Sequence, residues 1–220
     1  MLDFSGLRAA DFEALASGAA TTMFIIVVVA AAGAVLSVLG AAIRRGRNRL
    51  FSAAVGWYVE AIRNTPFLVQ LFFIYFGLPS LGIRLNAVVA AIAAMTLNLA
   101  AYGVEIVRAG LDAVPRGQWE AAQSLGLSRY RVFVSVILPQ ALRVIWPALS
   151  GQIVITMLES AVVSQLAVRD LTYQADILQA RTFRPFETYL FVTAIYFLLA
   201  VLMRQAMDRA SVRWLFGGRR

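Results

Sequence analysis

The sequence predicts an all-α integral membrane protein with about five transmembrane helices. Of its 220 residues, 60% are apolar and only 15% are charged, a balance more apolar than that of ordinary soluble domains. The apolar residues are grouped in long uncharged runs, and these approach the roughly 20 residues that a helix needs to cross a bilayer. No linker or low-complexity segment interrupts the chain, so residues 1–220 are predicted to form a single transmembrane domain.

The uncharged runs place the helices and one long cytoplasmic loop. The run that begins at Val144 is short, but it can be extended through Glu159 to about Leu166, which places one acidic residue inside a helix. We therefore expect helices at residues 19–43, 65–83, 85–110, 144–166 and 188–207, and a cytoplasmic loop at residues 114–139.

The first predicted helix has the features of a packed membrane anchor. Small residues recur along it, which lets a neighbouring helix backbone approach closely in lipid. These residues are Ala30, Gly33, Ala34, Ser37 and Ala41. The segment before the helix carries Asp3, Asp11 and Glu13 and lacks the basic start of a secretory signal, so we expect the helix to be retained.

Two features precede the second predicted helix. Residues 51–63 combine aromatic and aliphatic side chains with charged ones, which predicts an amphipathic helix at the cytoplasmic membrane interface. Asn64-Thr65-Pro66 then predicts a helix start, because a side-chain oxygen can accept a bond from a free amide and proline fits the first helical position.

The placement of arginines predicts the orientation. The chain has twenty basic residues, all of them arginines, and fifteen fall on one side of the predicted helices. Because positively charged loops are retained in the cytoplasm, the N-terminus is predicted outside and the C-terminus inside. The fifteen are Arg44, Arg45, Arg47, Arg49, Arg63, Arg108, Arg116, Arg129, Arg131, Arg143, Arg204, Arg209, Arg213, Arg219 and Arg220.

The composition excludes several classes of protein. The chain has no Cys, His or Lys, which removes disulfides, Cys or His metal sites and a histidine general base. A Walker-type phosphate loop needs a lysine, so any ATP hydrolysis is predicted to reside in a partner chain. The net charge of +8 follows from the positively charged loops that are retained in the cytoplasm. The sequence shows no basic face interleaved with aromatic residues, so nucleic-acid binding is not expected.

The cytoplasmic loop predicts a short helix that ends at a glycine. Residues 119–125 can form two helical turns, and Gly126 suits the left-handed position that closes a helix. Ser128 can cap the helix that follows. Glu120 lies near the predicted start of the short helix, where a negative charge suits the helix dipole.

This loop resembles the coupling loop of permease subunits of ATP-binding-cassette (ABC) importers. In that family, Glu-Ala-Ala is followed after three residues by Gly and, after nine more, by Ile-x-Leu-Pro. The matching residues here are Glu120, Ala121, Ala122, Gly126 and Val136-Ile137-Leu138-Pro139, with valine in place of the first isoleucine. The resemblance implies that Glu120, Ala121, Ala122 and Gly126 couple an ATPase to the pore.

Further stretches resemble the polar-amino-acid branch of the same family, and the resemblance covers residues 19–208. The start of the second helix is similar to that branch's Arg-Gly-Thr-Pro segment, with Asn64 in place of the glycine. The other similar stretches are residues 101–110, 139–143 and 181–187.

This resemblance implies a type I ABC importer permease fold in a bacterial plasma (inner) membrane, moving polar amino acids into the cytoplasm by alternating access. The implied partners are ABC ATPase subunits, a second permease subunit of the same or a homologous kind, an extracytoplasmic solute-binding protein, the amino-acid substrate and membrane lipid. ATP and Mg would be bound by the ATPase subunits, and this chain is expected to bind no cofactor or metal and to have no catalytic residues of its own.

Polar residues inside the predicted helices are the candidates for the substrate path, because each is costly in hydrocarbon unless it faces a partner or a cavity. They are Asn98, Gln152, Glu159 and Ser160. A buried glutamate can hold the ammonium of an amino acid, so Glu159 is the main candidate. An interhelical hydrogen bond, or a hydrated position near the outer interface, explains Glu159 equally well.

The family often places Lys-Asp before its Ser/Thr and Ser where this chain has Leu158-Glu159-Ser160-Ala161. The missing lysine leaves open a non-substrate-binding partner subunit of a heterodimeric permease. A channel or a membrane scaffold remains a further alternative, whereas an intramembrane enzyme is not favoured, since only Glu105 and Glu159 are acids in or near the spans. Arg108, three residues from Glu105, predicts a structural ion pair.

Overall fold

The structure, a computed structural model, describes residues 8–214, and Asp3, Arg219 and Arg220 lie outside these residues. All regular elements of the described residues are helical. They are α1 (Ala9–Arg45), α2 (Arg49–Arg63), α3 (Phe67–Phe72), α4 (Ala87–Asp112), α5 (Arg116–Ser124), α6 (Arg129–Val132), α7 (Leu138–Glu159), α8 (Leu171–Thr182) and α9 (Pro185–Trp214). Two π-helical turns, Phe73–Gly77 and Phe133–Ile137, and two 3-10 turns, Leu78–Leu81 and Ser160–Leu166, adjoin them.

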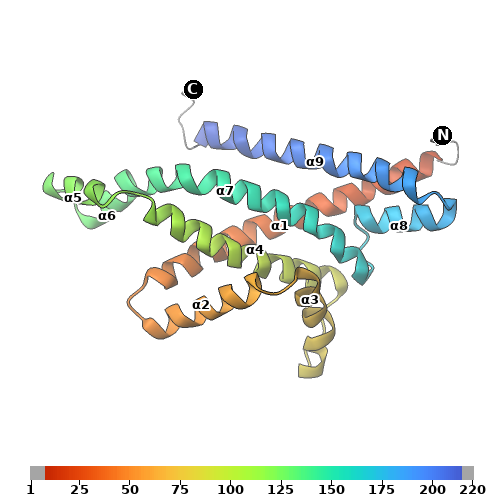
Figure 1. Cartoon of the computed structure of the whole chain (residues 1–220), viewed down its shortest axis with the longest axis horizontal. Coiled ribbons are helices and arrows are strands. Elements are labelled where there is room, and N and C mark those ends of the chain that lie inside the picture. The colour runs from red at the N-terminus through yellow and green to blue at the C-terminus, as the bar shows by residue number, and fades with distance from the viewer. Residues whose placement is uncertain (1–7, 215–220) are drawn as a thin grey trace.

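Four helical segments among the described residues are long and apolar enough to cross a membrane, namely Ala9–Arg45, Ala87–Asp112, Arg129–Leu166 and Pro185–Arg213. A fifth candidate is a pair, Arg49–Arg63 with Phe67–Leu81, bent by 112°. Counting the pair as one span gives the predicted five. The four long segments run lengthwise, with α5 and α6 at one end and α8 and the N-terminal end of α1 at the other (Figure 1).

The helices extend well beyond the predicted apolar runs. α1 begins at Ala9 and not at residue 19, so Asp11 and Glu13 lie inside the helix. The fourth span begins at Arg129 and not at residue 144, and α9 exceeds the predicted residues 188–207 at both ends. A helix rises 1.5 Å per residue, so the 38 residues of the fourth span are roughly 55 Å long, against a hydrocarbon core of about 30 Å. The ends of these helices that extend beyond the apolar runs are polar, so hydropathy alone does not predict them.

The predicted helix start at Asn64 is wrong in detail. The Asn64 Nδ2 donates to the Glu60 carbonyl at 2.8 Å, and the Thr65 hydroxyl donates to the Ala61 carbonyl at 2.8 Å. Both side chains therefore close α2 and do not open α3. Pro66, in an extended conformation, immediately precedes α3. The helix predicted over residues 51–63 is present as α2.

The small residues of α1 pack against α4, as their spacing predicts. This is the most extensive contact between two elements of the described chain. A Cβ atom at Gly103 of α4 would overlap the Ser37 hydroxyl, and one at Gly40 would overlap the Val104 side chain. The two backbones are thus as close as glycine and serine permit, which is how helices gain packing energy in lipid.

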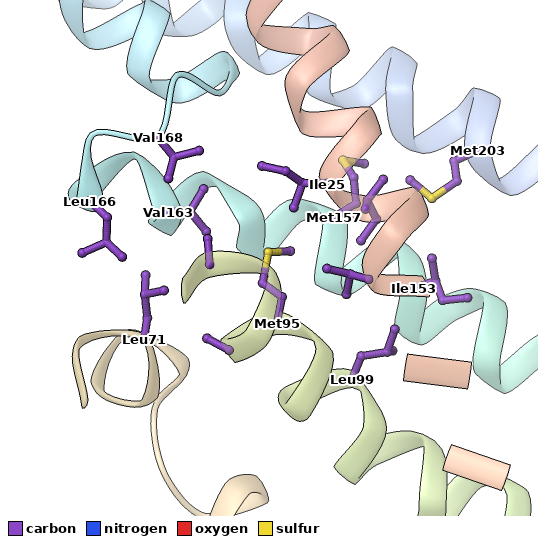
Figure 2. Packing of buried hydrophobic residues seen from close by; sticks show 14 residues of the cluster. Ile25, Leu71, Met95, Leu99, Ile153, Met157, Val163, Leu166, Val168 and Met203 are labelled. Atoms are coloured by element: carbon purple, nitrogen blue, oxygen red, sulfur yellow. The ribbon is translucent and has the colours of Figure 1, made fainter. Parts of the chain in front are cut away.

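The main hydrophobic core lies where the long helices meet α3 (Figure 2). Ile25 of α1, Met95 of α4 and Met157 of α7 are fully buried in it. Leu71 of α3 and Met203 of α9 join the same cluster. The core therefore ties the bent pair and the last helix to the central α1–α4–α7 group.

Helix α8 is an element that the hydropathy pattern does not predict. Asp170 caps its start, because the carboxylate accepts the Tyr173 N–H at 2.8 Å. The Tyr196 hydroxyl of α9 donates to the other carboxylate oxygen at 3.4 Å, and the Leu171 N–H donates to the Thr22 hydroxyl of α1 at 3.2 Å. This buried polar cluster joins α1, α8 and α9; Asp170 and Leu171 lie between the candidate spans, whereas Thr22 and Tyr196 belong to two of them.

The buried Asp170 carboxyl predicts a pH-dependent stability. Burial raises its pKa from an ordinary 3.8 to about 6, and the backbone bonds from Tyr173 and Thr172 offset only part of this. Between these two values the folded state binds more protons than the unfolded state, so the contribution is largest below pH 4 and is lost as pH rises through 6.

We expect the stability of wild type relative to Asp170→Asn to fall by about 2 kcal/mol between pH 4 and pH 6. Asparagine keeps the capping oxygen without titrating. Thermal unfolding of both proteins in detergent at each pH measures this difference. A difference that stays constant, or that grows with pH, would contradict a raised pKa of Asp170 in the folded protein.

Candidate coupling helix and substrate path

Helix α5 ends in a complete Schellman turn. Gly126 has φ +76°, the left-handed conformation predicted for it. Its N–H donates to the Gln123 carbonyl at 2.9 Å, and the Leu127 N–H donates to the Ala122 carbonyl at 3.4 Å. These two bonds define the motif, and Leu127 with Ala122 supplies its apolar contact. The chain therefore leaves α5 at a fixed angle.

One face of α5 is anchored and the other is free. Ala122 is buried, and Trp119 packs with it against a cluster that includes Val107 of α4 and Ile137. The remaining coupling candidates, Glu120, Ala121 and Gly126, are exposed. α5 thus presents a small polar surface at the end of the molecule and is held from behind.

Two details of the predicted coupling loop need correction. α5 begins at Arg116, three residues before the predicted start, so Glu120 lies in mid-helix and the dipole argument for it fails. Ser128 occupies the capping position of α6, but its side chain makes no capping bond.

A continuous helical segment leads from the coupling loop into the membrane. It runs from Arg129 through a π-helical turn at Phe133–Ile137 and along α7 to Leu166. At Glu159 the α-helix tightens into a 3-10 turn. Non-α turns inside helices often mark functional or strained positions. α5 is therefore connected, through the Gly126 turn, to one continuous helical segment that reaches Glu159.

Asn98 is paired with a residue that the sequence pattern did not single out. Its Nδ2 donates to the Gln70 Oε1 at 3.0 Å, and the Gln70 amide in turn donates to the Ile62 and Thr65 carbonyls at 2.7 and 2.9 Å. The Asn98 Oδ1 is buried with no hydrogen-bond partner in the described structure. A buried acceptor of this kind needs an explanation.

Glu159 is half-buried at the end of α7. Within residues 8–214 its carboxylate makes no hydrogen bond or ion pair. Ser160 beside it is fully buried, and its hydroxyl donates to the Met157 carbonyl at 2.6 Å. Gln152 lies two turns earlier on α7 and is partly buried. α7 packs against α4, which carries Asn98, but no bond in the described residues joins Asn98 to the three α7-side candidates.

The ion pair predicted from the i, i+3 spacing is confirmed. The Arg108 guanidinium donates to the Glu105 carboxylate at 2.7 Å and also pairs with Asp112 at 3.1 Å. Arg44 of α1 lies 3.9 Å from the same glutamate. Glu105 therefore belongs to a structural network at the α5 end of α4.

Sequence reasoning missed several residues at these sites. Gln70 and Thr96 are amides or hydroxyls within apolar runs, and the rule that selected Asn98 would have found both. Leu125 and Tyr130 flank the Gly126 turn with exposed fractions of 81% and 76%. Large exposed apolar residues beside a predicted contact helix are a signal for a partner surface.

The family profile of the "Binding-protein-dependent transport system inner membrane component" matches residues 33–216. The "Probable glutamine ABC transporter permease protein GlnM" of Bacillus subtilis (strain 168) is 38% identical over 168 residues, 74% of this chain and 77% of that protein. The "L-cystine transport system permease protein TcyB" of the same organism is 35% identical over 172 residues, 78% of this chain and 74% of that protein.

Solved structures agree with this match. The "Crystal structure of an amino acid ABC transporter with histidines" contains a chain that is 35% identical, with a TM-score of 0.88 over 97% of this chain and 99% of that one. A chain of the MetNI methionine ABC transporter in an inward-facing conformation has a TM-score of 0.73 over 95% of this chain and 99% of that one, at 22% identity, which supports the fold. These matches establish that this chain belongs to the family of binding-protein-dependent transport system inner membrane components, as a permease subunit of an ABC importer.

Proposed function

We propose that this permease subunit moves a polar amino acid into the cytoplasm, with ATP hydrolysis on separate ABC ATPase subunits. The names of the relatives, which include glutamine and cystine transport permeases, support this cargo class. The observation that carries the coupling mechanism is the fixed junction at Gly126 between α5 and the segment that ends beyond Glu159. The chain lacks the lysine that a Walker loop requires.

The orientation that we propose puts the α5 end in the cytoplasm. The α1–α2 turn and α5 lie at that end, and α9 returns toward it (Figure 1). Arg44, Arg45, Arg47 and Arg49 border the turn, which agrees with the retention of positive loops inside. The N-terminus would lie outside a bacterial inner membrane, where a solute-binding protein delivers cargo.

The proposed transport cycle follows from this arrangement. Two permease subunits, identical or homologous, would each seat α5 on an ATPase. Closure of the ATPase pair on ATP would draw the two α5 helices together. The helical segment Arg129–Leu166 of each subunit would carry that movement to the pore. Hydrolysis would release them. In such a cycle α5 needs a firm backing and an exposed outer face, and it has both.

Co-purification tests this function directly. The tagged chain is purified in mild detergent from its native host, and its companions are identified by mass spectrometry. An ATPase retained with it, together with ATP-driven uptake of glutamine, cystine or another polar amino acid in proteoliposomes, is the expected result. A stable complex without an ATPase would indicate a channel or scaffold instead.

We expect Glu159→Gln to raise the KM for the amino acid by about 10-fold or more. A charge-assisted bond to the cargo ammonium contributes about 1.5–3 kcal/mol, and Glu159 has no cation partner among the described residues that would use its charge instead. Uptake kinetics in proteoliposomes measure the change. Glu13→Gln, an exposed glutamate of α1, is the matched control.

Unchanged kinetics in Glu159→Gln with an intact complex would favour the second candidate, a partner subunit that does not bind substrate. That alternative is motivated by Leu158, which stands where the family often has a lysine. In that case the second permease would be a different chain, which mass spectrometry of the same complex reveals.

A further inference from the structure

A groove of about 310 Å³ lies between α7 and α9, apart from the residues assigned above. Its lining consists of Pro147, Ser150, Gly151, Val154 and Ile155 from α7 and Arg204 and Asp208 from α9. The volume is at the lower end of the range for small-molecule sites. It therefore suits a ligand with few heavy atoms, or the head of a larger one.

The packing of the two helices keeps this groove open. The Trp146 indole N–H donates to the Met207 carbonyl at 3.2 Å and ties α7 to α9 next to Pro147 and Asp208. Gly151 is exposed, and a Cβ atom there would meet nothing within 4 Å. The wall of the groove on the α7 side is consequently bare backbone at this point.

The two charged side chains of the groove have no protein partner among the described residues. Arg204 and Asp208 are one turn apart on α9, at a spacing that often gives an ion pair. Yet within the described residues neither side chain makes an ion pair or hydrogen bond, with each other or with any other group. Both side chains are exposed and lie in the C-terminal part of α9, toward the proposed cytoplasmic end, where a charged ligand can reach them.

This chemistry is the complement of a zwitterion. A guanidinium binds a carboxylate or phosphate through two parallel N–H donors, and a carboxylate one turn away can accept from an ammonium. Ile155, which lines the groove, lies one turn before Glu159 on α7. The groove thus begins near the level of Glu159 and extends toward the α5 end, on the proposed cytoplasmic side.

We propose that the α7–α9 groove is a second binding site, for a small zwitterionic group that carries an ammonium close to an acidic oxygen group. Arg204 holds the acidic group and Asp208 holds the ammonium. The amino-acid cargo leaving the level of Glu159 has this chemistry, and so does the headgroup of an aminophospholipid. The assignment to cargo rests on the proposed function, and the position beside Glu159 favours that source.

Direct binding to the whole transporter complex tests the site. The complex is placed in nanodiscs of phosphatidylglycerol alone, without ATP, and binding of the radiolabelled amino acid that shows ATP-driven uptake is measured, glutamine being tried first. In a Glu159→Gln background, the remaining binding reports the groove. We expect Arg204→Gln or Asp208→Asn to weaken this remaining binding at least 10-fold.

Arg209→Gln is the matched control, since Arg209 is also an exposed arginine of α9 and does not line the groove. It should bind like wild type. Co-purification of the ATPase with each variant shows that the complex is intact. Gly151→Leu, which fills the groove without changing a charge, should weaken binding as strongly as the charge variants.

A second arm separates the two sources of zwitterion. Nanodiscs that also contain phosphatidylethanolamine are analysed by native mass spectrometry for retained lipid. Retention by wild type that is lost in Arg204→Gln and Asp208→Asn, without cargo binding in the first arm, assigns the site to lipid. If neither cargo binding nor lipid retention changes in these variants, the zwitterion site is overturned. The proposed function fails separately, through absence of uptake by the wild-type complex.

Discussion

Replacing Gly126 by valine is expected to reduce ATP-driven uptake by about 10-fold or more while ATP hydrolysis by the complex continues. Gly126 has φ +76°, where a residue with a Cβ costs about 1–2 kcal/mol and a β-branched one is a true outlier. A Cβ there would meet nothing within 4 Å, so the cost lies in the backbone and not in a clash. The turn would relax, and α5 would lose its fixed angle to α6.

Two companion variants isolate that cause. Gly117 also lies in α5 with open space around a built Cβ, but without a positive φ, so Gly117→Val should retain uptake. Gly126→Asn should retain most of it, because asparagine tolerates the left-handed region. Uptake and phosphate release are measured in the same proteoliposomes. Normal uptake in Gly126→Val, or an equal loss in Gly117→Val, would contradict the coupling role.

The sequence was informative where a local requirement selects a residue type. Only a residue without a Cβ closes the α5 turn at no cost, so Gly126 was identified from its position after a short helical run. Gly33 and Ser37 were identified for a similar reason, since close helix contact in lipid requires small side chains. These features depend on neighbours in the chain or on one repeating face.

Element boundaries depended on contacts that no local pattern contains. The early start of α1 is fixed by Asp11, which pairs with Arg181 of α8 far along the chain. α8 itself is too polar for a hydropathy signal and is held by the buried Asp170. Asn64 had the residue type of a helix start, yet its amide serves the end of the preceding helix.

The substrate path was the least predictable part. Rules on intramembrane polarity selected Asn98, but its hydrogen-bond partner Gln70 lies on another element, 28 residues earlier. Glu159 stays a prediction, and no described residue forms an ion pair with its carboxylate. Whether two polar residues meet depends on how α3, α4 and α7 pack, and that is a property of the assembled core.

A second large effect is expected from Gly103→Val, which should destabilise the subunit by about 3 kcal/mol or more, at or beyond the upper end for overpacking. The Cβ atom of any side chain at residue 103 would overlap the Ser37 hydroxyl, and Ser37 is fully buried. Neither backbone can retreat easily, because α1 and α4 are joined along most of their length. The yield and the melting temperature of the purified subunit should both fall.

The smaller substitution Gly103→Ala gives the sharper test of close backbone approach. In a helix, glycine to alanine normally stabilises by about 1 kcal/mol, so Gly151→Ala, with open space around its Cβ, should raise the melting temperature. Gly103→Ala should lower it, and Ser37→Gly combined with Gly103→Ala should restore much of the loss by moving the bulk across the contact. Equal effects of alanine at residues 103 and 151, or no restoration by Ser37→Gly, would show that α1 and α4 are not held together by this contact.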